Sequence, residues 1–125
     1  NKLATVKSLI RAGANINEVN DALRIMLDPD GLDGVGYSAL LYAIRTYIYE
    51  GFDKLSDGAI GVYETIEEYE DSESSSFLEV IKFLIDNGAD VNIRNIEGET
   101  PLSLSKEFPK LTKFLKDNGA YLQWK

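Results

Sequence analysis

Three segments of the sequence share one pattern, in which an apolar stretch is followed by a glycine and a short alternating segment. The segments read LIRAGANIN from Leu9, LIDNGADVN from Leu84 and LKDNGAYLQ from Leu115. The glycine in each falls where a residue in the left-handed conformation ends a helix. Repetition of this kind restricts the chain to architectures in which similar units stack side by side.

The segment 76–101 contains one unit in full. Its apolar residues have helical spacing up to Asn87-Gly88, and an extended stretch with alternating apolar residues follows. Glu97-Gly98 predicts a turn. Thr100 then suits the N-cap of a new helix, and Pro101 suits its first position. The predicted unit is therefore a helix, a turn, an extended finger and a second helix.

The start of the second helix also recurs, since GYSALLYA from Gly36 matches GETPLSLS from Gly98. Together the two halves resemble the ankyrin repeat, a unit of about 33 residues with a T-P-L-H-x-A signature. Thr100, Pro101 and Leu102 occupy signature positions, while the signature histidine is replaced by Leu41 and Ser103. The resemblance implies an all-α fold, a solenoid of stacked helix-turn-helix units with short β-hairpin-like fingers.

This reading divides one domain, residues 1–125, into about three repeats with two insertions. The first repeat is incomplete because the helix that carries the T-P-L-H-x-A signature, which comes first in each ankyrin repeat, is missing from it. The expected parts are a partial repeat at 1–20, an inserted finger segment at 21–33, a second repeat at 34–97 and a C-terminal capping repeat at 98–125. Lys110, Lys113 and Lys116 give the last unit a polar face, and Trp124 is expected to fold back over the end of the stack.

Both insertions have their own predicted structure. Asp21 to Leu27 is expected to form a short helix, ended by a turn at Asp28 to Gly31. The insertion in the second repeat spans about 51–76 and follows a helix predicted for 38–50. We expect a loop at 51–58, an amphipathic helix at 59–69 and a mobile polar segment at 70–76.

Composition excludes several kinds of chemistry. The 125 residues include no cysteine and no histidine, so disulfides, thiolate metal sites and Ser–His or Cys–His nucleophile systems are ruled out. The formal charge of −8 disfavours nucleic acids and anionic membranes as partners. No apolar run reaches transmembrane length. We expect a cytoplasmic, monomeric protein without cofactors or catalysis, whose partner is another protein, with a basic one as an option.

Two loop motifs do not meet the requirements of a ligand site. An EF-hand loop counted from Asp28 would need a glutamate at its twelfth position, which is Ala39. The glycines at 31, 34 and 36 have the wrong order for a phosphate loop, and no P-loop lysine follows them. The acidic run from Glu64 to Glu73 is read as a solvated face or a contact surface for a basic partner.

The resemblance implies contacts through the finger tips and through the inner faces of the first helix of each repeat, which is the helix that carries the signature. Carried onto this chain, these positions are Tyr37, Tyr42, Arg45 and Tyr49 in the second repeat and Ile96, Glu97, Glu99 and Lys106 in the third. We add Glu67, Glu68 and Glu70 from the insertion. Tyrosine gives a large contact area at low entropic cost, although some of these tyrosines could instead pack under the insertion.

Three functions stay open at this point. The first is a protein-interaction module whose specificity is set by the finger tips, the inner helices and the two insertions. The second is an immunity-type neutraliser of a basic toxin or enzyme, since opposite charges speed encounter. The third is a structural segment of a longer ankyrin array.

Overall fold

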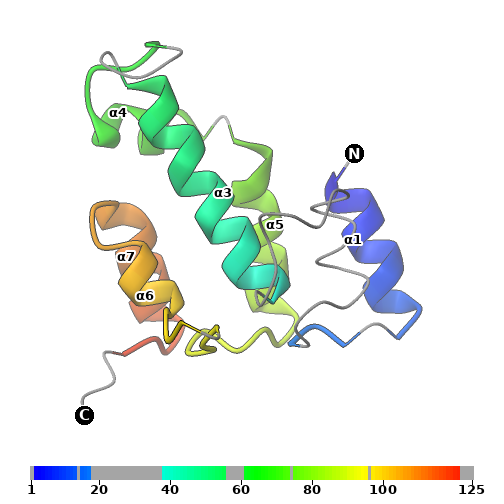
Figure 1. The fold of residues 1–125 in the computed structure, drawn as a ribbon. Helices are drawn as coiled ribbons and strands as arrows, with labels where there is room; N and C mark the ends of the chain where they lie inside the picture. The colour runs from blue at the N-terminus through cyan, green and yellow to red at the C-terminus, as the bar shows by residue number, and fades with distance from the viewer. Residues whose placement is uncertain are drawn as a thin grey trace.

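The computed structural model describes residues 2–13, 15–17, 38–55, 61–73, 75–95 and 97–121. Within these ranges the chain forms helices and no sheet, apart from a single parallel bridge between Leu55 and Tyr63 (Figure 1). The helices are α1 (Lys2–Arg11), α3 (Ala39–Lys54), α4 (Ile66–Ser72), α5 (Ser76–Asp86), α6 (Pro101–Leu104) and α7 (Pro109–Asp117). The expected all-α fold class is confirmed.

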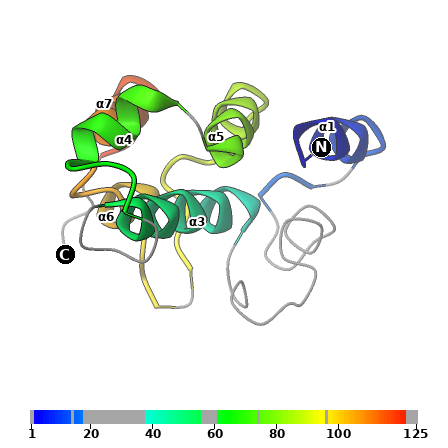
Figure 2. The same ribbon diagram turned by 90° about the horizontal axis from the view of Figure 1, so that it is seen from above.

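The helices stack as paired units. α3 and α5 pack against each other and run in opposite directions (Figure 1). The next pair along the chain is formed by α6 and α7, which also pack against each other. Between units, α1 packs against α5 and α3 packs against α6. Seen from above, α4, α5 and α7 lie on one side of α3, while the extended segment before α6 runs on the other side (Figure 2).

All three recurring glycines adopt the left-handed conformation, with a φ of 99° at Gly13. Gly88 and Gly119 have φ angles of 99° and 101°, the left-handed conformation that was expected to end these helices. The N–H groups of Ala89 and Ala120 donate to the carbonyls of Leu84 and Leu115, both at 2.9 Å. Leu84 and Leu115 are fully buried, so they occupy equivalent positions in successive units.

The asparagine that closes each of the first two motifs ties one unit to the next. Asn17 accepts the N–H of Asp90 at 2.6 Å and donates to the carbonyl of Gly88 at 3.4 Å. One unit later, Asn92 accepts the N–H of Tyr121 at 3.1 Å and donates to the carbonyl of Gly119 at 3.2 Å. The repeated asparagine therefore holds consecutive units in the same register.

The sequence predicts the ends of several helices correctly. Thr100 caps α6 by accepting the N–H of Ser103 at 3.1 Å, and Pro101 takes the first helical position. Ser38 caps α3 in the same manner, with the N–H of Leu41 at 3.3 Å. Each cap satisfies a backbone donor that has no partner inside its helix.

The predictions for the insertion at 51–76 are partly wrong. Residues 51–54 continue α3 instead of forming a loop, because the helix buries Gly51 against α4 and the loop before α7. The expected helix at 59–69 starts only at Ile66, since Thr65 caps it by accepting the N–H of Glu68 at 3.1 Å and Gly61 to Thr65 are not helical.

The polar segment at 70–76 was expected to be mobile, and this is also wrong for its described residues. Glu70 to Ser72 belong to α4, and Ser75 is the N-cap of α5. The expected helix at Asp21 to Leu27, the turn after it and Trp124 lie outside the described residues.

Candidate functional site

One face of α3 presents a stripe made of the half-buried Arg45 and the exposed Tyr49 and Phe52. Tyr49 is 52% exposed and Phe52 is 37% exposed. The guanidinium carbon of Arg45 lies 4.5 Å from the centre of the Tyr49 ring, a distance at which a cation is attracted to the aromatic face. These three residues, spaced i, i+4 and i+7, are called the α3 stripe below.

Tyr42 was expected on the same surface, but it is almost fully buried. Its ring lies edge-on against Phe77 of α5 with 6.5 Å between the ring centres. Tyr42 lies about one helical turn before Arg45, and its side chain faces α5, so it is enclosed between α3 and α5. Of the three predicted α3 residues, only Arg45 and Tyr49 therefore remain accessible to a partner.

The finger before α6 is held by Asn95. Its side-chain oxygen accepts the N–H groups of Glu97 and Glu99, both at 2.9 Å, and its amide donates to the Glu99 carboxylate at 2.7 Å. Gly98 has a φ of 80°, which allows the tight turn. Glu97 is exposed at the tip, whereas Glu99 is half-buried and its carboxylate takes part in holding the finger.

The other predicted contact residues are separated in space. Lys106 is exposed, but it lies after α6 next to α7 and not on the finger. Glu67 and Glu68 are exposed on α4. Tyr37 and Ile96 lie outside the described residues.

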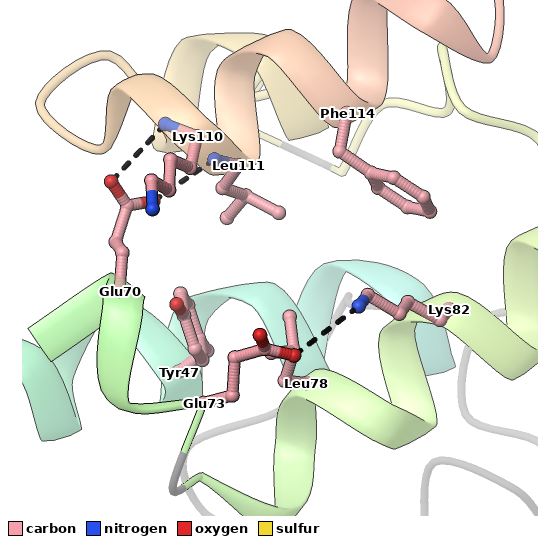
Figure 3. A pocket seen from close by; sticks show the side chains of 8 residues that line it. All are labelled: Tyr47, Glu70, Glu73, Leu78, Lys82, Lys110, Leu111 and Phe114. Carbon is pink, nitrogen blue, oxygen red and sulfur yellow. Dashed lines mark hydrogen bonds and ion pairs between the residues drawn. The ribbon is translucent and has the colours of Figure 1, made fainter.

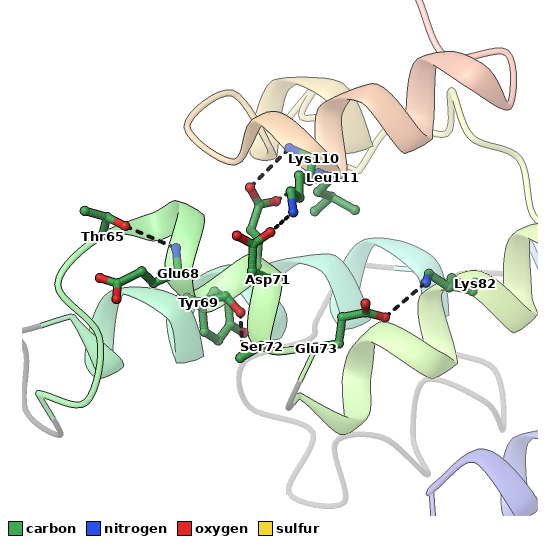
Figure 4. A network of polar contacts seen from close by, with 10 residues as sticks. Thr65, Glu68, Tyr69, Asp71, Ser72, Glu73, Lys82, Lys110 and Leu111 are labelled. Atoms are coloured by element: carbon green, nitrogen blue, oxygen red, sulfur yellow. Dashed lines mark hydrogen bonds and ion pairs between the residues drawn. The ribbon is translucent and has the colours of Figure 1, made fainter.

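Glu70 has a different position from the one predicted, because it is buried with only 4% of its surface exposed. Its two carboxylate oxygens accept the N–H of Lys110 at 3.1 Å and that of Leu111 at 2.9 Å (Figure 3). Figure 4 shows Lys110 and Leu111 together with the neighbouring Asp71. These donors belong to the first turn of α7, where Phe108 provides no side-chain cap. Glu70 thus caps α7 from α4, and it is not available to a partner.

The same junction includes an ion pair between Asp71 and Lys110. A carboxylate at a helix N-terminus also interacts favourably with the helix dipole. Together, the cap and the ion pair fasten the insertion to the last unit. Sequence reasoning missed this role, because nothing local relates Glu70 to a helix start 40 residues away.

An aromatic cluster fills the space between α3, α4 and the loop before α7. Tyr69 donates its hydroxyl proton to the carbonyl of Tyr47 at 2.7 Å, and the two rings have centres 5.0 Å apart. Phe108 packs edge-on against Tyr69 at 6.1 Å and against Phe52 at 5.4 Å. Some tyrosines therefore pack under the insertion, which was the alternative left open.

The two buried tyrosines of this cluster resist ionisation. Burial raises the pKa of Tyr47 and Tyr69 far above the usual value of a phenol. The negative charge of Glu70 adds to this rise in the pKa of both. Both hydroxyls are therefore neutral across the physiological range.

A hollow of about 190 Å³ opens between α5 and α7 (Figure 3). Its floor is apolar, from Leu78, Leu111, Phe114 and Tyr47, and its rim includes the pair Glu73–Lys82 at 3.8 Å. It exists because the Cα atoms of α5 and α7 stay more than 8 Å apart, whereas α4 contacts α7. The hollow is smaller than the roughly 300–1,000 Å³ of small-molecule sites.

The described residues contain no cluster of acidic side chains that could hold a metal ion. None of the described helices has the length and hydropathy needed to cross a membrane. What the geometry offers is a stripe with two exposed aromatic rings, a finger hydrogen-bonded by Asn95 and charged surfaces on stacked helical units.

Comparison with known proteins identifies the class of these units. The ankyrin-repeat family model matches residues 71–96, which include α5 and the extended segment after it. The chain is an ankyrin-repeat protein. No solved structure matches it significantly.

A more particular similarity is to Ankyrin repeat protein OPG189 of Variola virus. The two are 30% identical over 106 residues, which is 79% of this chain and 19% of that protein. The same protein from the isolate Human/India/Ind3/1967 gives equal values. The chain thus spans about a fifth of the length of the relatives that it matches. Ankyrin repeats are generally protein-binding modules.

Proposed function

We propose that this chain binds its partner through the α3 stripe and the finger before α6. The observation that carries the proposal is the exposed Tyr49 ring under the Arg45 guanidinium, 4.5 Å away. Tyrosine and arginine are enriched among residues that dominate the binding energy of interfaces. An exposed aromatic ring already oriented by a neighbouring cation loses little conformational entropy when a partner covers it.

The finger supplies the second part of this surface. Asn95 makes three hydrogen bonds to Glu97 and Glu99, which reduce the conformational entropy that these residues lose on binding. Glu97 is exposed there, and the finger runs on the side of α3 opposite α5 (Figure 2). Tyr37, Ile96 and Glu99 remain candidate contacts of the same surface. The partner chemistry that fits is an apolar or aromatic group next to a basic side chain.

The insertion would set specificity at the edge of this surface. Glu67 and Glu68 are exposed on α4, which packs on the C-terminal part of α3. The aromatic cluster and the Glu70 cap hold α4 in place, so its carboxylates have fixed positions relative to the stripe. A partner that fits the α3 stripe but places negative charge next to Glu67 and Glu68 would be repelled by them and would not be bound.

The test is cross-linked capture from the source cells with the wild-type chain, the double variant Arg45→Ala/Tyr49→Ala and the control Tyr121→Ala. Tyr121 is 60% exposed at the far end of the described chain, so the control removes an equally accessible tyrosine. We expect one partner to be retained by the control and lost by the double variant. The affinity for the purified partner should fall by about 30-fold or more, the usual size of a hot-spot loss of ~2 kcal/mol.

Retention of the partner by the double variant would refute this surface. Circular dichroism melting curves check that the variants are folded. If no variant changes capture of the partner, a structural role within a longer array becomes the better explanation.

A second candidate is neutralisation of a basic protein. It is favoured by the net charge of −8 and by the exposed carboxylates of Glu64, Glu67 and Glu68. The association rate with the purified partner separates the two functions, because electrostatic steering weakens steeply with salt. A neutraliser loses association rate steeply as salt is added, whereas the association rate of binding centred on the α3 stripe changes little with salt.

A further inference from the structure

Positive charge is concentrated at one end of this acidic molecule. Residues 101–121 contain four lysines and two carboxylates, while the rest of the chain contains nine basic and nineteen acidic residues. Three of these lysines line a shallow hollow of about 410 Å³ on the outer side of α7. The residues of this end face are Lys106, Pro109, Thr112, Lys113, Lys116 and Asp117.

A comparison of α5 with α7 shows how this face arises. Counted from the glycine that follows each helix, Ile81 and Ile85 of α5 correspond to Thr112 and Lys116 of α7. Thr112 is half-buried and donates its hydroxyl proton to the carbonyl of Ser105 at 2.7 Å, whereas Lys116 is exposed to solvent, where an uncharged or acidic side chain would serve equally well. Because the chain already carries a charge of −8, lysines at this face are not needed for solubility.

Only one of the three lysines of the end face forms an ion pair among the described residues. Lys113 pairs with Asp117 at 3.0 Å. Within the described ranges, neither Lys106 nor Lys116 forms an ion pair with a carboxylate, in contrast to Lys110, which pairs with Asp71. Lys106 and Lys116 are thus exposed at the hollow, and its lining carboxylate, Asp117, is paired with Lys113.

We propose that the end face binds a carboxylate-rich segment of a partner protein. This is a second contact surface, separate from the α3 stripe and the finger. The hollow is open, so it can receive a peptide segment along α7 while carboxylates reach Lys106 and Lys116. The sign of the charge selects an acidic segment in preference to a neutral one.

The size of the ligand argues for a short acidic segment and against a nucleic acid. At physiological ionic strength, charges more than about 8 Å away are largely screened, so a short segment on the end face interacts mainly with the local lysines. A nucleic acid extends beyond the patch and meets the acidic remainder of the molecule, which repels its phosphates.

The proposal is tested with a fluorescein-labelled oligoglutamate peptide, an uncharged serine-glycine peptide of equal length, and fluorescence anisotropy. We expect saturable binding of the acidic peptide alone. In NMR spectra of the labelled chain, amide shifts should concentrate at Thr112, Lys113 and Lys116. Because this mapping uses the wild-type chain, it holds even if a variant is poorly folded.

The double variant Lys106→Gln/Lys116→Gln should weaken binding at least about fivefold, since each exposed charge pair contributes a modest amount. The matched control Lys82→Gln/Arg94→Gln removes the same charge from exposed positions elsewhere and should change binding less than about twofold. An equal loss in the control would overturn the proposal, because net charge and not the end face would then be responsible.

Absence of saturable binding, or amide shifts away from α7, would also overturn it. Tighter binding of a single-stranded oligonucleotide of equal charge would assign the face to nucleic acid instead. Sedimentation of the chain alone tests the last alternative. If it shows a dimer that the double variant Lys106→Gln/Lys116→Gln disrupts, the end face binds a second copy of the chain instead.

Discussion

At the scale of single residues, Gly51 shows how tightly the insertion is joined to the repeat. A Cβ atom added there would lie 2.8 Å from ring carbons of both Tyr69 and Phe108, closer than van der Waals contact permits. The glycine is needed for a close approach of α3, α4 and the loop before α7, and not for an unusual backbone conformation. The same two rings belong to the aromatic cluster that buries Tyr47.

Gly51→Ala therefore tests the packing directly. In an isolated helix this substitution would stabilise by roughly 0.5–1 kcal/mol. Here we expect the free energy of unfolding to fall by about 1–3 kcal/mol, as is typical of overpacked sites. Urea denaturation measures the change, with Asp53→Ala, an exposed residue of the same helix, as the control. A stabilised Gly51→Ala variant would show that the rings move away without cost.

At the scale of helices, the start of α7 depends on a residue from another element. The side chain of Phe108, which precedes α7, has no oxygen that could cap the first turn, and two backbone donors are satisfied by Glu70 of α4 instead. A buried donor that loses its acceptor costs more than the mean value of a hydrogen bond. The insertion is consequently a structural support of the last unit as well as an addition to the second.

Glu70→Gln should remove much of this support. The amide keeps the shape of the side chain, but it has one acceptor oxygen and turns an N–H₂ group toward a backbone donor. We expect a loss of about 1–3 kcal/mol in the free energy of unfolding, in the range for charged hydrogen bonds and helix caps. Hydrogen exchange of α7 should accelerate more than that of α5. The control Glu67→Gln, at an exposed position of α4, should have almost no effect on either measurement.

At the scale of the whole molecule, stability depends on stacking and on the two buried tyrosines. The pKa of Tyr47 and Tyr69 is raised in the folded state, mainly by burial, and returns to about 10 in the unfolded chain. Their contribution to stability is thus fully present below about pH 10. It is lost as the pH rises further, because only the unfolded chain then releases the phenolic protons.

The expected result is a decline in the free energy of unfolding above about pH 10, with each tyrosine contributing up to ~1.4 kcal/mol per pH unit. Tyr47→Phe should make this decline shallower, because one of the two phenolic protons is no longer present. Urea titrations between neutral and strongly alkaline pH measure the slope. An unchanged slope in Tyr47→Phe would mean that this hydroxyl already ionises in the folded state.

The sequence by itself determined the local features of the repeat. Gly88 ends a helix because a left-handed residue is required there, and Thr100 with Pro101 begins the next because both suit a first turn. Leu84 and Leu115 lie equally far before their glycines, which predicted that they occupy equivalent positions in successive units. These features depend on neighbouring residues only, so the ankyrin class and the helical fold could be predicted from them.

The tertiary structure decided what the insertion does and which candidate residues are accessible. Tyr42 and Arg45 are close in sequence, yet α5 covers the first and leaves the α3 stripe outside. Glu70 looked like part of an exposed acidic run, but it caps a helix that follows far along the chain. Such contacts join residues that are distant in sequence, and their energy exists only once the helices have come together.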